Sequence, residues 1–143
     1  MLGVKDPGAI SRFRPGSRAR LALERRHAEA TLWDAFLHYL ARERYAVPAA
    51  QLSRDVTARV EASREVQEIL ISVYRTDTKI TELCERLVDL DEGVQEWRYR
   101  HIKMVERTIG TKAGTGGSSG ADYLRSTLSY PVFPDLWEIR SRL

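Results

Sequence analysis

Apolar residues recur at helical spacing along most of the chain. One helix start is well marked, because Thr31 and Asp34 have the three-residue separation of a capping box. The residues that follow place an apolar face at Leu32, Trp33, Phe36, Leu37 and Leu40. This spacing predicts a helix that ends near Tyr45, before Val47-Pro48, since a residue that precedes proline disfavours helical backbone.

A longer apolar stripe begins after Ser63. Its members alternate in steps of three and four residues: Val66, Leu70, Val73, Asp77, Ile80, Cys84 and Leu87. The stripe predicts one long helical run over residues 63–87 with one face on a core. The acidic residues of segment 89–93 suit the first turn of a further helix. We expect that helix to run to about Ile109, where Gly110 offers a C-terminal stop.

The two ends of the chain add shorter elements. A loop over residues 5–16 leads into a helix near Ser17, and residues 130–140 predict a turn and a short amphipathic helix. The apolar side of this last helix consists of Phe133, Leu136, Trp137 and Ile139. No convincing alternating, β-branched segment and no internal repeat is present, so the fold class is all-α, a helical bundle over residues 1–143. Its wide apolar faces need partners, which predicts an oligomer.

Composition narrows the class of protein. With 143 residues, 43% apolar and 30% charged, the chain fits one globular domain. We expect a cytoplasmic protein, because no apolar run approaches membrane-spanning length and the first residues lack signal-peptide features. The single Cys84 sits in a helical apolar setting typical of a buried side chain. The N-terminal arginines have almost no interleaved aromatic residues, so nucleic acid is not an expected partner.

The glycine-rich segment 110–124, GTKAGTGGSSGADYL, raises the question of a phosphate or nucleotide site. A P-loop is excluded because Lys112 precedes the glycines instead of following them. The GxGxxxG spacing of Gly114, Gly116 and Gly120 is close to a dinucleotide fingerprint, but that fingerprint must follow a β-strand, and a helix is predicted here. Two interpretations remain open: a flexible linker, or a lid that orders over a ligand and presents amides and hydroxyls, Thr115 among them.

His101 lies on the helix that precedes this segment. It shares a face with residues that are mostly apolar: Val94, Trp97, Met104 or Val105, and Thr108. Such a histidine is either a hydrogen-bonded core residue or a single axial ligand of a haem iron. His27 and His38 lie among charged residues and are expected to be solvated. The sequence shows neither the ligand spacing of a zinc site nor an assignable Ser-His-Asp arrangement.

Two neighbouring elements of this region carry a specific pattern. The first is the run Glu96-Trp97-Arg98-Tyr99-Arg100-His101, and the second is the segment 109–120 followed by Tyr123-Leu124-Arg125. Together they closely resemble the tryptophan 2,3-dioxygenase family. The resemblance extends upstream through residues 84–89 and 36–41 and downstream to 133–137. It covers nearly all of this chain and corresponds to about the C-terminal half of the family.

The resemblance implies an all-helical, haem-dependent homotetramer with one haem per subunit. The family inserts O2 across the indole C2–C3 bond of L-tryptophan and forms N-formyl-L-kynurenine, a reaction of tryptophan catabolism along the kynurenine pathway. The match places the proximal ligand of the haem iron at His101, and at Thr115 the loop residue that contacts the polar end of the substrate. The family's distal histidine, its carboxylate-binding arginine and the aromatic wall of its indole pocket belong to the half that the resemblance does not cover.

The same pattern supports two alternative functions. One is a non-catalytic helical module that pairs with a separate N-terminal half. The other is a haem-dependent oxygenase that acts on a different aromatic amino acid.

Overall fold

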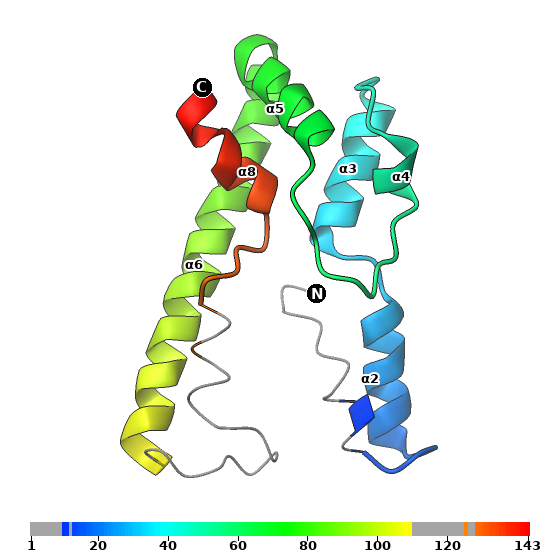
Figure 1. Cartoon of the computed structure of the whole chain (residues 1–143), viewed down its shortest axis with the longest axis vertical. Helices are drawn as coiled ribbons and strands as arrows, with labels where there is room; N and C mark the ends of the chain where they lie inside the picture. Colours follow the sequence, from blue (N-terminus) through cyan, green and yellow to red (C-terminus); the bar gives the residue numbers. More distant parts are fainter. Residues whose placement is uncertain (1–9, 12, 110–124, 126–127) are drawn as a thin grey trace.

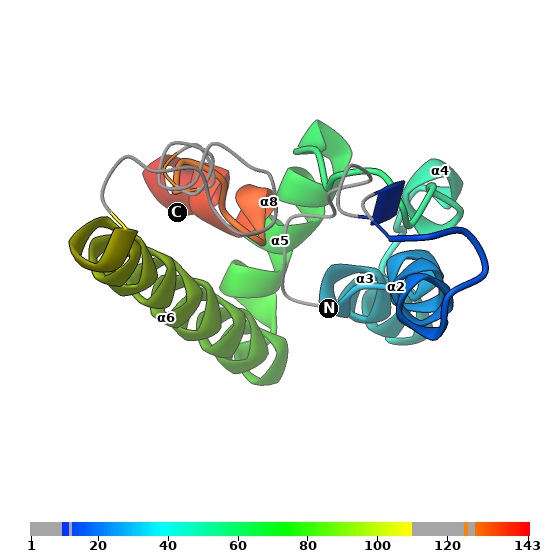
Figure 2. The same ribbon diagram turned by 90° about the horizontal axis from the view of Figure 1, so that it is seen from below.

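The computed structural model describes residues 10, 11, 13–109, 125 and 128–143, and every regular element in these ranges is helical (Figure 1). The predicted all-α fold class is therefore confirmed. Two views show α6, Thr78–Ile109, along one side of the molecule (Figures 1 and 2). Helices α2, Arg18–Ala28, and α3, Leu32–Arg42, lie along the other side, and α5, Arg64–Thr76, lies near one end of α6 and of α3.

The first helices begin where the sequence places their caps. Helix α2, Arg18–Ala28, starts after Ser17, whose hydroxyl accepts a hydrogen bond from the Arg20 amide. Helix α3, Leu32–Arg42, starts after Thr31 with a complete capping box: the Thr31 hydroxyl accepts from the Asp34 amide, and the Asp34 carboxylate accepts from the Thr31 amide. The predicted starts of both helices are confirmed.

The end of α3 was placed too late by the sequence. The helix stops at Arg42 and not near Tyr45, because Arg44 adopts a left-handed backbone conformation with φ 72°. A short helix follows, α4, Ala49–Leu52. Arg54 then reaches back to α3 and donates hydrogen bonds of 2.5 and 3.1 Å to the buried Asp34 carboxylate.

The single helix predicted over residues 63–87 is wrong at one point. The chain forms α5, Arg64–Thr76, and α6, Thr78–Ile109, with the extended residue Asp77 between them. The Asp77 carboxylate accepts a hydrogen bond from the Ile80 amide at 3.0 Å, which is the geometry of a helix N-cap. The apolar stripe continues in register across this break, so its apolar residues are nevertheless buried as expected, while Asp77 is half-buried.

The helix start predicted at residues 89–93 is also wrong, because α6 runs through this segment without interruption. Asp91 is fully buried in the middle of the helix and does not act at a helix N-terminus. One carboxylate oxygen accepts hydrogen bonds from the amides of Val132 and Phe133, at 2.8 and 3.1 Å, and from the Trp137 indole at 2.9 Å. Asp91 thus fastens the C-terminal segment to α6.

The C-terminal segment closes the core as a short helix α8, Pro134–Glu138, and a 3-10 helix η1, Ile139–Arg142. The predicted turn and amphipathic helix are confirmed. Helix α8 packs on α5 and α6, beside the upper part of α6 in Figure 1. The fully buried large apolar side chains come from α3, α5, α6 and this C-terminal segment: Trp33, Leu37, Leu40, Val66, Leu70, Val73, Ile80, Phe133, Leu136 and Ile139.

Candidate functional site

The run Trp97 to His101 lies on the second half of α6, and its side chains differ in burial. Trp97 and Tyr99 are 64% and 53% exposed, whereas Arg98 is only 9% exposed. Arg98 donates a 2.8 Å hydrogen bond to the Tyr130 carbonyl. His101 is half-buried. Arg98 therefore anchors the run to the rest of the fold, and the exposed aromatic residues face outward.

The His101 imidazole lies in a sparse environment. Its ring stacks on the Trp97 indole, with the ring centroids 5.2 Å apart and the planes 5° from parallel. None of the side chains or backbone groups that the structure describes forms a hydrogen bond or an ion pair with it. Within the described part of the chain, neither ring nitrogen is committed to a partner. An imidazole in this state can serve as a ligand without losing an existing contact.

The predicted face around His101 is not covered by a core formed by the described part of this chain. Met104 is 56% exposed, and Thr108 is exposed as well, while Val94 and Val105 are half-buried. On the same half of α6, Ile102 is the buried apolar residue at 2% exposure. The side chains that share a face with His101 thus form an open, largely apolar surface.

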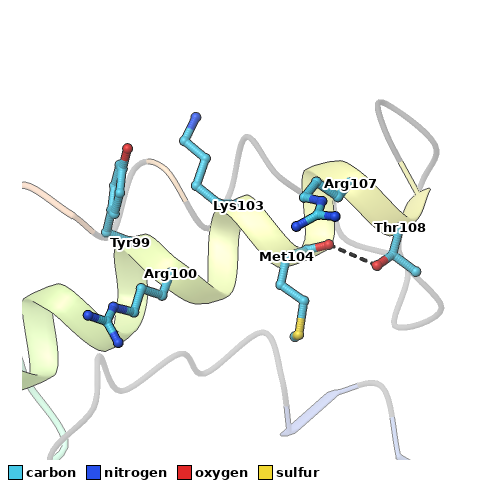
Figure 3. Close-up of a pocket in the computed structure, with 6 residues that line it drawn as sticks. All are labelled: Tyr99, Arg100, Lys103, Met104, Arg107 and Thr108. Carbon is cyan, nitrogen blue, oxygen red and sulfur yellow. Dashed lines mark hydrogen bonds between the residues drawn. The ribbon is translucent and has the colours of Figure 1, made fainter.

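Beside this face lies a hollow of about 450 Å³ (Figure 3). The described residues that line it belong to α6: Tyr99, Arg100, Lys103, Met104, Arg107 and Thr108. Tyr99 and Lys103 point to one side of the helix, and Arg100 and Met104 point to the other (Figure 3). Ion pairs hold two of the three cations, Arg100 with Glu96 at 2.6 Å and Lys103 with Glu106 at 3.0 Å.

The segment that returns after the glycine-rich stretch is fastened to the same helix. Arg125 donates to the Glu106 carboxylate with two nitrogens, at 3.0 and 2.7 Å. Lys103 and Arg125 hold the pKa of the Glu106 carboxyl below its usual value. Further along, the Arg59 guanidinium lies 3.6 Å from the centre of the Tyr130 ring. Spacing along the sequence does not reveal these contacts, although Arg125 is itself one of the residues that carry the resemblance.

The predicted substrate contact, Thr115, lies outside the described residues, as does the expected helix stop Gly110. The structure describes the helix that precedes this segment: α6 continues to Ile109, two turns beyond His101. At 1.5 Å of rise per residue, this separation is about 12 Å. A segment that leaves α6 at Ile109 and returns at Arg125 begins and ends near the His101 end of the helix.

The other candidate residues are placed as follows. His38 is exposed as expected, and its Nδ1 lies 2.8 Å from the Asp34 carbonyl oxygen. His27 is half-buried. Cys84 is fully buried, and this burial raises the pKa of its thiol to about 12, which makes a reactive thiolate scarce at neutral pH.

The described ranges contain no group of three or more His, Cys, Asp or Glu side chains that could hold a metal ion. A single axial histidine is not such a group, so this result does not bear on haem. In the same ranges, no helix has the length and apolar character that a membrane span requires.

Comparison with known proteins defines the family. The sequence model of the tryptophan 2,3-dioxygenase family matches residues 51–143. A tryptophan 2,3-dioxygenase of Herpetosiphon aurantiacus is 57% identical over all 143 residues, which span 54% of that protein. The enzymes of that name from Anaeromyxobacter sp. (strain K) and Myxococcus xanthus are 50% and 41% identical over the whole of this chain, and it covers 54% and 50% of them.

An all-helical chain with these matches belongs to the tryptophan 2,3-dioxygenase family. It spans about half the length of the curated relatives that it matches.

Proposed function

We propose that this chain supplies the proximal haem side of a tryptophan 2,3-dioxygenase, which uses O2 to open the indole ring of L-tryptophan and form N-formyl-L-kynurenine. Membership of the family supports the reaction. The observation that carries the site is His101: an imidazole on a long helix, half-buried, with no hydrogen-bond partner among the described residues.

The residues around His101 fit a haem. A haem site needs an axial nitrogen and apolar surface for the porphyrin. His101 provides the nitrogen, and the exposed Trp97 and Met104 on the same side of α6 provide apolar surface. When bound, the haem supplies the iron chemistry that activates O2. The role of the protein is to hold it through His101, as a neutral imidazole, and to place the substrate beside it.

The proposed role of Thr115 is to bind the polar end of L-tryptophan through its hydroxyl and neighbouring amides. The described residues on either side of Thr115 support it, since α6 ends at Ile109, two turns after His101, and Arg125 is bound to Glu106 on the same helix. A substrate contact between these two points would cover the substrate and exclude water from it.

The open face of α6 supports the proposal that residues 1–143 form one helical domain that works with further protein. Trp97, Tyr99 and Met104 are all more than half exposed on this helix, and large exposed apolar surfaces mark sites of association. We propose that the remaining half of the family's length covers part of this face, and that the assembly is a homotetramer in the cytoplasm. The buried, unpaired Cys84 is compatible with a reducing compartment.

The test combines the chain with haem, ascorbate and L-tryptophan and follows N-formyl-L-kynurenine. One mixture contains the chain alone. A second also contains the N-terminal segment of the Herpetosiphon aurantiacus relative, the part that this chain does not match. We expect product in the second mixture. Absence of product in both mixtures, at any protein concentration, would refute the proposed activity.

Two histidine variants test the ligand. His101→Ala should abolish both product formation and the Soret band of the haem-loaded protein. His38→Ala is the matched control, because His38 is also a helical histidine but is exposed on α3. It should leave both signals unchanged. A Soret band that is the same in His101→Ala as in the wild type would exclude His101 as the axial ligand.

A second candidate function follows from the length of the match. Because the chain spans about half of its relatives, it can also act as a non-catalytic module whose partner carries the activity. This alternative predicts that His101→Ala still gives product in the second mixture. Product formation by His101→Ala in the second mixture therefore distinguishes the two functions.

A further inference from the structure

Trp97 and His101 form the closest ring pair on the second half of α6. They are four residues apart, so their side chains share one face of the helix. The ring planes differ by 5° and the centroids are 5.2 Å apart, which is the separation of an offset stack. The two rings therefore lie parallel, one turn of helix from each other.

Burial within the chain does not explain this arrangement. Trp97 is 64% exposed, in contrast to its neighbours Arg98 and Ile102, which the fold buries almost completely. The second side-chain torsion of histidine has broad wells, so a half-exposed imidazole has no strong preference for one ring plane. No described residue forms a hydrogen bond with His101. Among these residues, the Trp97 indole is the ring that stacks on the imidazole and lies parallel to it.

We propose that Trp97 is a positioning residue: its indole fixes the plane of the His101 ring and thereby the direction of the nitrogen that binds the haem iron. This inference rests on the proposed function. Histidine ligands usually obtain their orientation from a hydrogen bond at the second nitrogen. In the described part of this chain, stacking takes that place.

The strength of the stack sets the expected effect of removing the Trp97 ring. An aromatic pair contributes up to about 1.5 kcal/mol beyond its buried area, which corresponds to a two- to tenfold change in an equilibrium or a rate. Trp97→Leu removes the ring and keeps an apolar side chain. Trp97→Phe keeps a ring that can stack. Tyr99→Leu is the matched control, since Tyr99 is an aromatic residue on the same helix, also more than half exposed, without a contact to His101.

The stack itself is measured by proton NMR on the haem-free chain. The indole ring current shifts the His101 ring protons upfield, and their signals are assigned by their loss in His101→Ala. Trp97→Leu should remove this shift, Trp97→Phe should keep part of it, and Tyr99→Leu should leave it unchanged. Identical His101 signals in the wild type and in Trp97→Leu would overturn the inference.

The positioning role is measured by the rate at which the haem-loaded chain loses haem to an excess of apomyoglobin. Trp97→Leu should raise this rate two- to tenfold, and Trp97→Phe and Tyr99→Leu should stay within twofold of the wild type. An NMR shift that disappears in Trp97→Leu without any change in haem loss would overturn the role of Trp97 and leave the proposed function intact. A wild-type chain that binds no haem, either alone or with the N-terminal segment of the Herpetosiphon aurantiacus relative, would overturn both.

Discussion

Helix α6 has two halves that share one amphipathic pattern but differ in what covers them. The first half is closed by α5 and α8, and its inward side chains are buried: Ile80, Cys84, Leu87, Val88 and Asp91. In the second half the fold buries Arg98 and Ile102, while three large side chains are more than half exposed: Trp97, Tyr99 and Met104.

This difference shows what periodicity measures. A recurrence of apolar residues every three or four positions tells which face of a helix avoids water, but not which molecule covers that face. In the first half the covering groups come from the same chain, up to 46 positions away, since the Trp137 indole donates a hydrogen bond to the Asp91 carboxylate. In the second half the face with His101 stays open in the described structure, which is how a surface for a cofactor or a partner differs from a core.

The largest difference between the two halves is expected in the rate at which a cysteine thiol reacts, measured with Cys84 in the first half and an introduced cysteine in the second. Burial raises the pKa of the Cys84 thiol from 9.0 to about 12, so about a thousandfold less thiolate is present than for an ordinary cysteine. In the variant Met104→Cys, we expect Ellman's reagent at pH 8 to modify Cys84 at least about a thousandfold more slowly than the new thiol. In urea both should react at similar rates. Folded-state rates within tenfold of each other would contradict the burial difference.

Among the substitutions that affect stability, removal of the buried Asp91 carboxylate should lower the free energy of unfolding the most. Asp91→Ala leaves two backbone amides and the Trp137 indole without their acceptor, and each unsatisfied buried donor costs about 1–3 kcal/mol. We expect a loss of about 3 kcal/mol or more in urea unfolding. Asp89→Ala is the control, because Asp89 is exposed and pairs with the exposed Arg86. It should change stability by less than about 0.5 kcal/mol.

The junction of the two halves offers a stabilising change. Gly93 lies inside α6, and a Cβ added there would meet no atom within 4 Å. Gly93→Ala should raise the free energy of unfolding by about 0.5–1 kcal/mol, since glycine is the less favourable residue in a helix interior. A loss of stability in urea unfolding would show that the two halves of α6 are not one continuous helix at this point.

An ion pair in the first half should contribute a small, pH-dependent stability. The hydrogen bond from Tyr74 holds the pKa of the Glu85 carboxyl below 4.5 against the opposing effect of burial, and Arg140 lowers it further. A carboxyl with a lowered folded pKa stabilises the fold above its unfolded pKa and loses this contribution as the pH falls. Arg140→Met should cost about 0.5–1 kcal/mol at pH 7 and less at pH 3, because the pair is partly exposed.

The control for that pair lies in the second half of α6. Arg100 and Glu96 are 2.6 Å apart, but their side chains are 77% and 62% exposed. Arg100→Met should leave urea unfolding unchanged at both pH values. An equal effect of the two arginine substitutions would contradict the comparison.

The smallest effects are expected on the open face. Tyr99→Gln and Met104→Gln should each change the free energy of unfolding by less than about 0.5 kcal/mol, since their side chains are more than half exposed. Both should weaken any concentration-dependent association seen by sedimentation. A loss above about 1 kcal/mol would mean that the chain itself covers this face.

The elements that the sequence predicted well are those with local causes. The capping box of Thr31 and Asp34 needs only residues three positions apart, and it is present in the structure. The break at Asp77 was missed because the apolar stripe keeps its register through it. The available signal was the Asp77 side chain itself, a favourable N-cap that binds the Ile80 amide.

The role of Asp91 could not be predicted from the local pattern. Acidic residues near a glycine suit a helix start, and only contacts with Val132, Phe133 and Trp137 show why this carboxylate lies inside the fold. For the site, the sequence placed His101 on a helix face with apolar neighbours. The stack with Trp97 depends on side-chain torsions, and the bond between Glu106 and Arg125 depends on the path of the chain, so neither follows from spacing.

The uninterrupted course of α6 has a mechanical consequence. A helix of 32 residues is about 48 Å long. Packing against α5 and α8 and the hydrogen bonds of Asp91 hold one half of this length, whereas the half that carries His101 is tied to the fold through Arg98 and Glu106. Because the helix is continuous, a change of packing around Asp91 is transmitted along it to His101. A mutation that loosens this packing should tilt His101 without contacting it.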